Sequence, residues 1–246
     1  MRAERDLHDA RIQRKLAALR QRDFNFDPDR HAEHKPEPGW HLDDLCQPLP
    51  AERPGPPEPH GSWEIARRLM RGYEFADPSI VRAYYDPDEP LEGRTMLLEL
   101  RFWGLLRFDV GTRVVEVYDQ DRDRDGRRGH VWGWAYRTLE GHLEMGQMDW
   151  QVWKWPDSGA VEFRIHSYSR RAPDPNVVIR FGFLLFGRRE QVLFQHSTLR
   201  RMERLTAAGL RREGGEPVRL EAESLTARRG FASSGAHQEL GRRLEA

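Results

Sequence analysis

The residues best suited to chemistry in this sequence are His142 and Glu144, which lie two positions apart between Gly141 and Gly146. An imidazole titrates near neutral pH, so beside a carboxylate it forms a candidate general acid and base pair. Two other interpretations stay open. Both side chains bind a ligand, or both fix a tight turn by bonding to the backbone, with the glycines supplying dihedral angles that other residues avoid.

Sites that depend on a metal or a serine nucleophile find little support. The His-x-Glu spacing resembles that of zinc deaminases, but that site needs two further cysteines and the chain has only Cys46. Asp121 to Gly126 imitates a calcium loop, yet its twelfth position is Trp132 and arginines neutralise the carboxylates. Ser169 lacks the Gly-x-Ser-x-Gly context of a nucleophile. We therefore expect no metal and no cofactor, and a solvated hairpin tip at 121–126.

A second polar corner, Ser169 and Arg170, follows a strand-like run. Arginine carries a rigid five-donor fork suited to carbonyls and carboxylates. We expect the corner to bond to the turn at 141–146 or to the start of the last helix.

Composition restricts the class of protein. The 246 residues include 40 basic and 40 acidic side chains, so no net field favours nucleic acid or an anionic membrane surface. A single cysteine excludes an intramolecular disulfide framework. The N-terminus shows no secretory signal, and no apolar run is long enough to cross a membrane. We expect a cytoplasmic protein with no nucleic-acid partner and no transmembrane segment.

The chain divides into four predicted parts. Residues 1–22 form a helix with a narrow apolar stripe at Ile12, Leu16 and Leu19, interpreted as loosely docked or as a partner-binding element. Residues 23–61 are a proline-rich strap with one short strand near Trp40–Leu45. Residues 62–206 form the main domain. Residues 207–246, rich in Arg, Glu, Gly and Ser, are expected to be a disordered tail.

Within the main domain, Ser62 is a good N-cap for a short helix that ends at Gly72. The period then changes to that of strands, separated by short turn clusters. The predicted strands are 80–85, 95–107, 112–119, 130–138, 148–155 and 161–168. After Pro175 the pattern is helical to about Leu205, and this helix must lie across the sheet to bury its apolar face. The prediction is an α+β fold in which six to seven antiparallel strands curve around a long C-terminal helix.

Six tryptophans lie on these strands: Trp103, Trp132, Trp134, Trp150, Trp153 and Trp155. Core packing is the default role of an aromatic residue on a strand. Because Trp150 and Trp153 must point to opposite faces, some indoles are expected to face water or to line a cavity.

At these residues the chain resembles the DUF1990 (UPF0548) family, a group without an established activity. The family pattern reads Phe-x-Tyr-Gly-Thr-Leu-Pro-Gly-His-x-Glu-x-Gly-Glu, then Ser-Arg-Pro, then Arg-x-x-Gln. The matching residues are Trp134, Tyr136, Thr138, Leu139, Gly141, His142, Glu144, Gly146, Ser169, Arg170, Arg188 and Gln191. Departures from the pattern are Arg137, Glu140, Gln147 and Arg171.

The resemblance covers about residues 62–205 and implies a branch of the START/Bet v 1-like helix-grip proteins, in which a sheet and a C-terminal helix enclose an apolar cavity. We therefore expect a binding module for a small apolar or amphipathic ligand. The alternatives are an enzyme that uses His142 and Glu144 as acid and base, and an interaction protein with a filled cavity. The candidate ligand-binding residues are Trp134, Tyr136, Thr138, His142, Glu144, Ser169 and Arg170.

Overall fold

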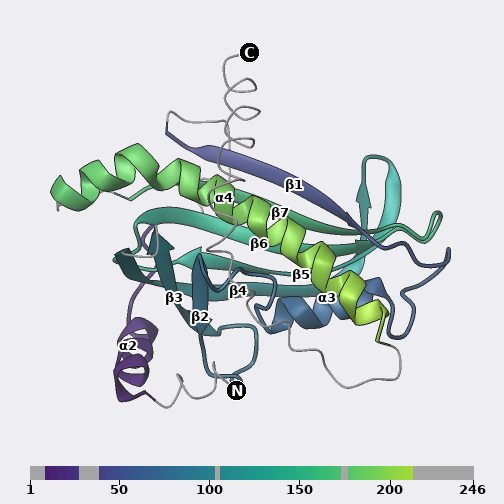
Figure 1. The fold of residues 1–246 in the computed structure, drawn as a ribbon, viewed down its shortest axis with the longest axis horizontal. Coiled ribbons are helices and arrows are strands. Elements are labelled where there is room, and N and C mark those ends of the chain that lie inside the picture. Colours follow the sequence, from purple (N-terminus) through teal and green to yellow (C-terminus); the bar gives the residue numbers. More distant parts are fainter. Residues whose placement is uncertain (1–8, 28–38, 103–105, 173–176, 213–246) are drawn as a thin grey trace. The chain divides into compact units, whose positions relative to one another are not determined.

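Seven antiparallel strands form a single sheet in the computed structural model, which describes residues 9–27, 39–102, 106–172 and 177–212 (Figure 1). The strand order is β1-β7-β6-β5-β4-β3-β2, so consecutive strands from β2 to β7 pair as a meander. Their bounds are β1 His41–Leu49, β2 Val81–Tyr84, β3 Thr95–Phe102, β4 Leu106–Arg124, β5 Arg127–Thr138, β6 Glu144–Lys154 and β7 Val161–Arg171. The predicted six to seven antiparallel strands are confirmed.

The longest helix, α4 (Val177–Leu210), crosses one face of the sheet, and the short helix α3 (Ser62–Arg71) contacts the same face (Figure 1). The main core lies between these helices and the sheet, with Trp150 and Phe163 stacked at its centre. This is the predicted helix-grip arrangement. The helix extends past the predicted end at Leu205, because Leu205 and Leu210 both pack against the core.

The cap of α3 differs from the prediction by one residue. Gly61, not Ser62, is the N-cap, while Gly72 is the C-cap as predicted. The carboxylate of Glu52 replaces a capping hydroxyl and accepts a hydrogen bond of 2.8 Å from the Trp63 backbone N–H. The strap before α3 therefore supplies the cap that a local serine was expected to supply.

The N-terminal helix α2 (Ala10–Arg20) packs against the opposite face of the sheet. Leu16 and Leu19 are buried against Leu97 and Leu139, whereas the neighbours of Leu97 on β3 face the main core. The apolar stripe was predicted correctly, but the loose docking was wrong, since a strand face with exposed leucines needs a cover. Residues 1–8 of the predicted helix lie outside the described residues.

The strand predicted in the strap and the hairpin predicted at 121–126 are both present, and their strands are longer than expected. The strap carries β1, a longer strand than expected, which pairs only with β7; Pro48 is tolerated there because an edge strand needs fewer backbone donors. The acidic stretch at 121–126 is a hairpin between β4 and β5, with Asp125 and Gly126 at φ 53° and 73°. Positive φ at both central residues is typical of a tight hairpin turn. Residues 28–38 and residues 213–246 of the predicted tail lie outside the described residues, whereas residues 207–210 of that tail are helical and continue α4.

Candidate ligand-binding site

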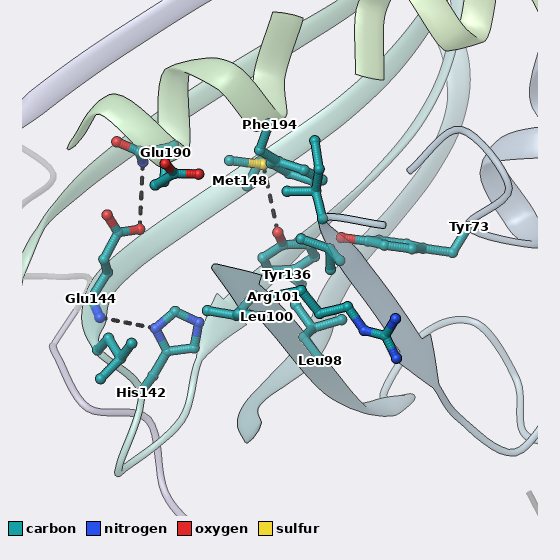
Figure 2. A pocket seen from close by; sticks show the side chains of 14 residues that line it. Tyr73, Leu98, Leu100, Arg101, Tyr136, His142, Glu144, Met148, Glu190 and Phe194 are labelled. Atoms are coloured by element: carbon teal, nitrogen blue, oxygen red, sulfur yellow. Dashed lines mark hydrogen bonds between the residues drawn. The ribbon is translucent and has the colours of Figure 1, made fainter. Parts of the chain in front are cut away.

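A pocket of about 90 Å³ opens between the sheet and the middle of α4 (Figure 2). Its apolar walls come from Ile80, Val81, Leu98, Leu100, Met148 and Phe194. The polar side chains of the lining include Arg101, Glu190 and Gln191 and two further pairs. His142 and Glu144 lie at one end, and the hydroxyls of Tyr73 and Tyr136 lie deeper in the lining (Figure 2). Apolar walls with a few directed polar groups are typical of small-molecule sites.

His142 both shapes the turn before β6 and lines the pocket. Gly141, at φ +83°, makes the turn possible, and the His142 N–H donates to the Leu139 carbonyl. The ring nitrogen Nδ1 accepts a hydrogen bond of 3.0 Å from the Glu144 backbone N–H, so Nε2 carries the proton. Burial lowers the pKa of His142 to about 4. At pH 7 this imidazole is neutral and acts as a hydrogen-bond donor rather than as a base.

Glu144 is the group in the pocket best placed to exchange a proton near neutral pH. Burial raises the pKa of its carboxyl to about 7, although the nearby charge of Arg188 opposes the shift. Its Oε2 lies 3.5 Å from Gln191 Nε2 on α4. His142 contacts the backbone of Glu144 but not its carboxylate, so the two side chains do not form the predicted acid and base pair.

The deeper polar group is a tyrosine pair. The Tyr136 hydroxyl lies 3.5 Å from Met148 Sδ, to which it donates. The Tyr73 hydroxyl points toward Tyr136, is buried and has no hydrogen-bond partner among the described residues (Figure 2). Burial raises the pKa of both phenols well above the usual value, so both stay protonated. An unpaired buried hydroxyl costs free energy unless a ligand or water satisfies it.

Behind Glu144, a polar network ties α4 to the edge of the sheet. Arg188 donates two hydrogen bonds to Asp43 on β1, of 2.5 and 2.7 Å, and Gln195 donates a third. Burial disfavours the ionised Asp43, but the bonds from Arg188 and Gln195 hold its pKa below the usual value. Gln191 donates a bond of 2.8 Å to Ser169 Oγ on β7. The network fixes the rotation of α4 above the pocket.

A family model described as "Domain of unknown function (DUF1990)" matches residues 28–202. The chain belongs to the DUF1990 family. No curated protein matches the sequence.

Among solved structures, the chain is similar to Ara h 8.0201 at 9% identity, with a TM-score of 0.40 over 69% of this chain and 99% of that one. It is also similar to ginseng major latex-like protein 151 from Panax ginseng, at 11% identity and a TM-score of 0.39, covering 67% and 96% of the two chains. A Thalictrum norcoclaurine synthase point mutant gives 9% identity and a TM-score of 0.40, covering 70% and 98%.

The residues of the DUF1990 motif occupy different places. Of the seven candidate ligand-binding residues, Tyr136, His142 and Glu144 line the pocket. Trp134 does not, because it is buried in the core against Tyr73 and Trp150. Thr138 is also outside the lining, since its hydroxyl bonds to Asn25 and to the Gly146 backbone.

The Ser169 and Arg170 corner lies outside the pocket lining as well. Arg170 reaches the predicted turn, whereas Ser169 accepts from Gln191 in the middle of α4 and not at the start of that helix. The Arg170 Nε lies 3.0 Å from Met145 Sδ, and its guanidinium lies 5.1 Å from the centre of the Trp40 ring. The contact to the turn is therefore made through sulfur and not through a carbonyl or carboxylate. The corner contacts Met145 and Gln191 without lining the pocket itself.

Two departures from the DUF1990 pattern compensate each other. Arg137 replaces a glycine and Gln147 replaces a glutamate, and the Arg137 Nε donates to Gln147 Oε1 at 2.7 Å across β5 and β6. Gln147 also accepts from the Tyr168 hydroxyl. Because Gln147 does not line the pocket, the presence of glutamine where the family pattern has glutamate removes no carboxylate from the site.

We expected some strand tryptophans to face water or to line a cavity, but among the described residues they are buried and outside the pocket lining; Trp103 lies outside the described residues. Trp153 and Trp155 stack on each other with ring centres 5.2 Å apart, on the face of the sheet away from α4. The guanidinium of Arg127 lies 4.5 Å from the centre of the Trp155 ring and helps to cover it. These two indoles are thus buried by stacking on each other and, for Trp155, by the Arg127 guanidinium, and not in a ligand site.

Sequence reasoning missed Tyr73 and Asp43. Tyr73 follows α3 in a turn at φ 55°, and Asp43 stands on an edge strand between Leu42 and Asp44. Neither position carries a local pattern that marks it. Among the described residues, no group of three or more potential ligands could hold a metal ion, and no helix has the length and apolar character to span a bilayer.

Proposed function

We propose that this DUF1990 domain binds a small apolar or amphipathic molecule in the pocket between the sheet and α4. Apolar walls would hold the body of the ligand, Glu144 and the Nε2–H of His142 would contact one polar end, and the Tyr73 hydroxyl would contact the deeper end. The domain positions these groups from the β5–β6 turn, from the loop after α3 and from the sheet itself.

The observation that carries this proposal is the Tyr73 hydroxyl, which is buried, points into the pocket toward Tyr136 and has no hydrogen-bond partner among the residues that the structure describes. A hydroxyl in such a place costs about 1–3 kcal/mol relative to a satisfied one. A ligand or a water molecule that accepts or donates at this point removes the cost.

The volume limits the ligand. At about 90 Å³ the pocket is smaller than an engineered apolar cavity of about 150 Å³ that admits benzene. Because the pocket is open at one side, a single ring need not lie wholly within the walls, whereas a larger ligand requires a shift of α4.

The enzyme alternative rests on one specific observation, the carboxyl of Glu144. Its pKa of about 7 suits a general acid or base at neutral pH. In this version Glu144 acts alone on a bound ligand, with neutral His142 donating a hydrogen bond. The filled-cavity alternative would leave the Tyr73 hydroxyl unpaired, which disfavours it.

The test compares benzene, phenol and benzylamine, which share a ring and differ in their polar group. Binding to the full chain is measured by NMR, and molecules that accompany the protein from its own host are extracted and identified by mass spectrometry. We expect phenol or benzylamine to bind at least about fivefold more tightly than benzene, the value of one net hydrogen bond.

Two matched variants locate the binding. Leu100→Trp fills the pocket and should abolish binding. Leu42→Trp makes the same change on β1, at a side chain that is 45% exposed and outside the pocket lining, and should not. If the probes bind equally to both variants, or if neither a probe nor a host molecule binds the parent protein, the proposed function is wrong.

A further inference from the structure

Residues 22–24 are fastened to the start of the turn that carries His142. The Arg22 guanidinium donates a bond of 2.8 Å to the Glu140 carbonyl, and the Glu140 N–H donates one of 2.9 Å to the Asp23 carbonyl. Phe24 forms an isolated bridge to Leu139. The first half of the turn is therefore paired with a segment more than a hundred residues earlier in the sequence.

Asn25 holds the other end of the same turn. Its side-chain NH₂ donates a bond of 2.8 Å to the backbone carbonyl of Glu144. Its carbonyl oxygen accepts a bond of 2.6 Å from the Thr138 hydroxyl, and its backbone N–H donates to the Thr138 carbonyl at 3.2 Å. One side chain thus joins the last residue of β5 to the first residue of β6.

The segment has a firm base of its own. Leu16 and Leu19 of α2 are almost completely buried. Arg113 on β4 donates to the carbonyls of Leu19, Arg20 and Arg22 at 3.0 to 3.3 Å, which satisfies the C-terminal end of α2. Residues 22–25 are consequently held in place independently of the turn they contact.

We propose that Asn25 is a positioning residue for the pocket, and that residues 22–25 form a built-in clamp on the turn that presents His142 and Glu144. The clamp lies outside the region that matches the DUF1990 model, which begins at residue 28. The inference rests on the proposed function, because the clamp matters to a ligand only if that pocket binds one.

The physical chain of effect runs through the backbone. The Glu144 carbonyl is fixed by Asn25, and the Glu144 N–H is fixed by the His142 ring. Release of the carbonyl lets the backbone on both sides of the Glu144 Cα move, which shifts the carboxylate and the imidazole together and admits water to both. Asn25 itself does not line the pocket.

The test uses the full chain with Asn25→Ala, and Lys15→Ala as the matched control. Lys15 forms an ion pair with Asp109 that also ties α2 to the sheet. Neither residue belongs to the turn at 141–146 or to the pocket lining. Two quantities are measured by NMR: the affinity for phenol and the titration of the Glu144 carboxyl.

We expect Asn25→Ala to bind phenol about fivefold or more weakly, consistent with the loss of one hydrogen bond in the site. The midpoint of the Glu144 titration should move down from about 7 toward the ordinary value, because water reaches the carboxyl. Lys15→Ala should leave both quantities as in the parent protein. A loss of melting temperature alone would not produce this difference.

If Asn25→Ala leaves both the affinity and the titration unchanged, or if Lys15→Ala alters them equally, the clamp is only structural and the inference is wrong. Should Asn25→Ala fail to fold, Arg22→Ala removes the bond to Glu140 from a more exposed position and replaces it in the test. Because the carboxyl titration needs no ligand, it still decides the role of Asn25 if phenol does not bind and the proposed function fails.

Discussion

Replacement of Tyr73 by phenylalanine removes one oxygen atom from the inner part of the pocket. In the folded protein this hydroxyl is buried and makes no hydrogen bond among the described residues, while in the unfolded chain it is hydrated. Folding therefore removes the hydrogen bonds between the Tyr73 hydroxyl and water, and no described residue replaces them. Unlike most changes at buried positions, Tyr73→Phe should not destabilise the protein.

The magnitude follows from the penalty for an unsatisfied buried polar group, about 1–3 kcal/mol. The pocket beside Tyr73 has room for water, which reduces the penalty toward its lower end. We expect a gain of up to about 1 kcal/mol, or about 2–4 °C in melting temperature for a domain of this size.

Tyr118→Phe is the matched control, since it makes the same chemical change on the other face of the sheet. The Tyr118 hydroxyl donates a bond of 2.7 Å to Asp149, whose pKa burial raises to about 6. At pH 8 the carboxylate is ionised, and loss of a hydrogen bond to a charged group costs about 1.5–3 kcal/mol. The melting temperature should therefore fall by several degrees.

The assay is thermal unfolding of parent, Tyr73→Phe and Tyr118→Phe at pH 8, followed by phenol binding. Tyr73→Phe should melt at or above the parent temperature yet bind phenol more weakly. If it melts as far below the parent as Tyr118→Phe does, the Tyr73 hydroxyl has a partner and the reasoning from an unpaired group is refuted.

Two further predictions concern buried charges. Glu144 holds a proton in the folded protein between its ordinary pKa of 4.5 and about 7, whereas the unfolded chain has lost it, so the parent should lose stability as pH rises through this range. Glu144→Gln lacks this loss, and the melting temperature of the variant minus that of the parent should grow from pH 4.5 to 7.5; a difference independent of pH would contradict the raised pKa. Lys154→Met should cost about 3–5 kcal/mol in urea unfolding, because it strands the carboxylate of Glu52, whose side chain is 2% exposed and 3.1 Å from the ammonium. Lys15→Met breaks a more exposed ion pair and should lower the free energy of unfolding by less than about 1 kcal/mol. Equal losses in the two variants would show that burial does not strengthen the dependence of Glu52 on Lys154.

The sequence by itself determined the elements and their order. Alternating residues such as Val161, Phe163 and Ile165 face one side of a strand because the side-chain period of a strand is two, and the last helix follows from a period near four. Gly141 and Gly146 marked a turn because they permit backbone geometry closed to other residues. At Gly146 a side chain would also meet the Tyr168 carbonyl oxygen at 2.1 Å. Such signals are local, so they survive without knowledge of the fold.

Only the tertiary structure decided which residues meet. Tyr73, His142 and Phe194 belong to three separate elements, and no spacing along the chain indicates that they line one pocket. The tryptophans on the strands led to a prediction that failed. They were expected to face water or to line a cavity, but Trp153 and Trp155 stack on each other and Arg127 covers Trp155. Asn25 reaches Glu144 only because α2 is anchored on the far face of the sheet. Contacts of this kind depend on how the sheet brings distant residues together, and a local pattern carries no record of that.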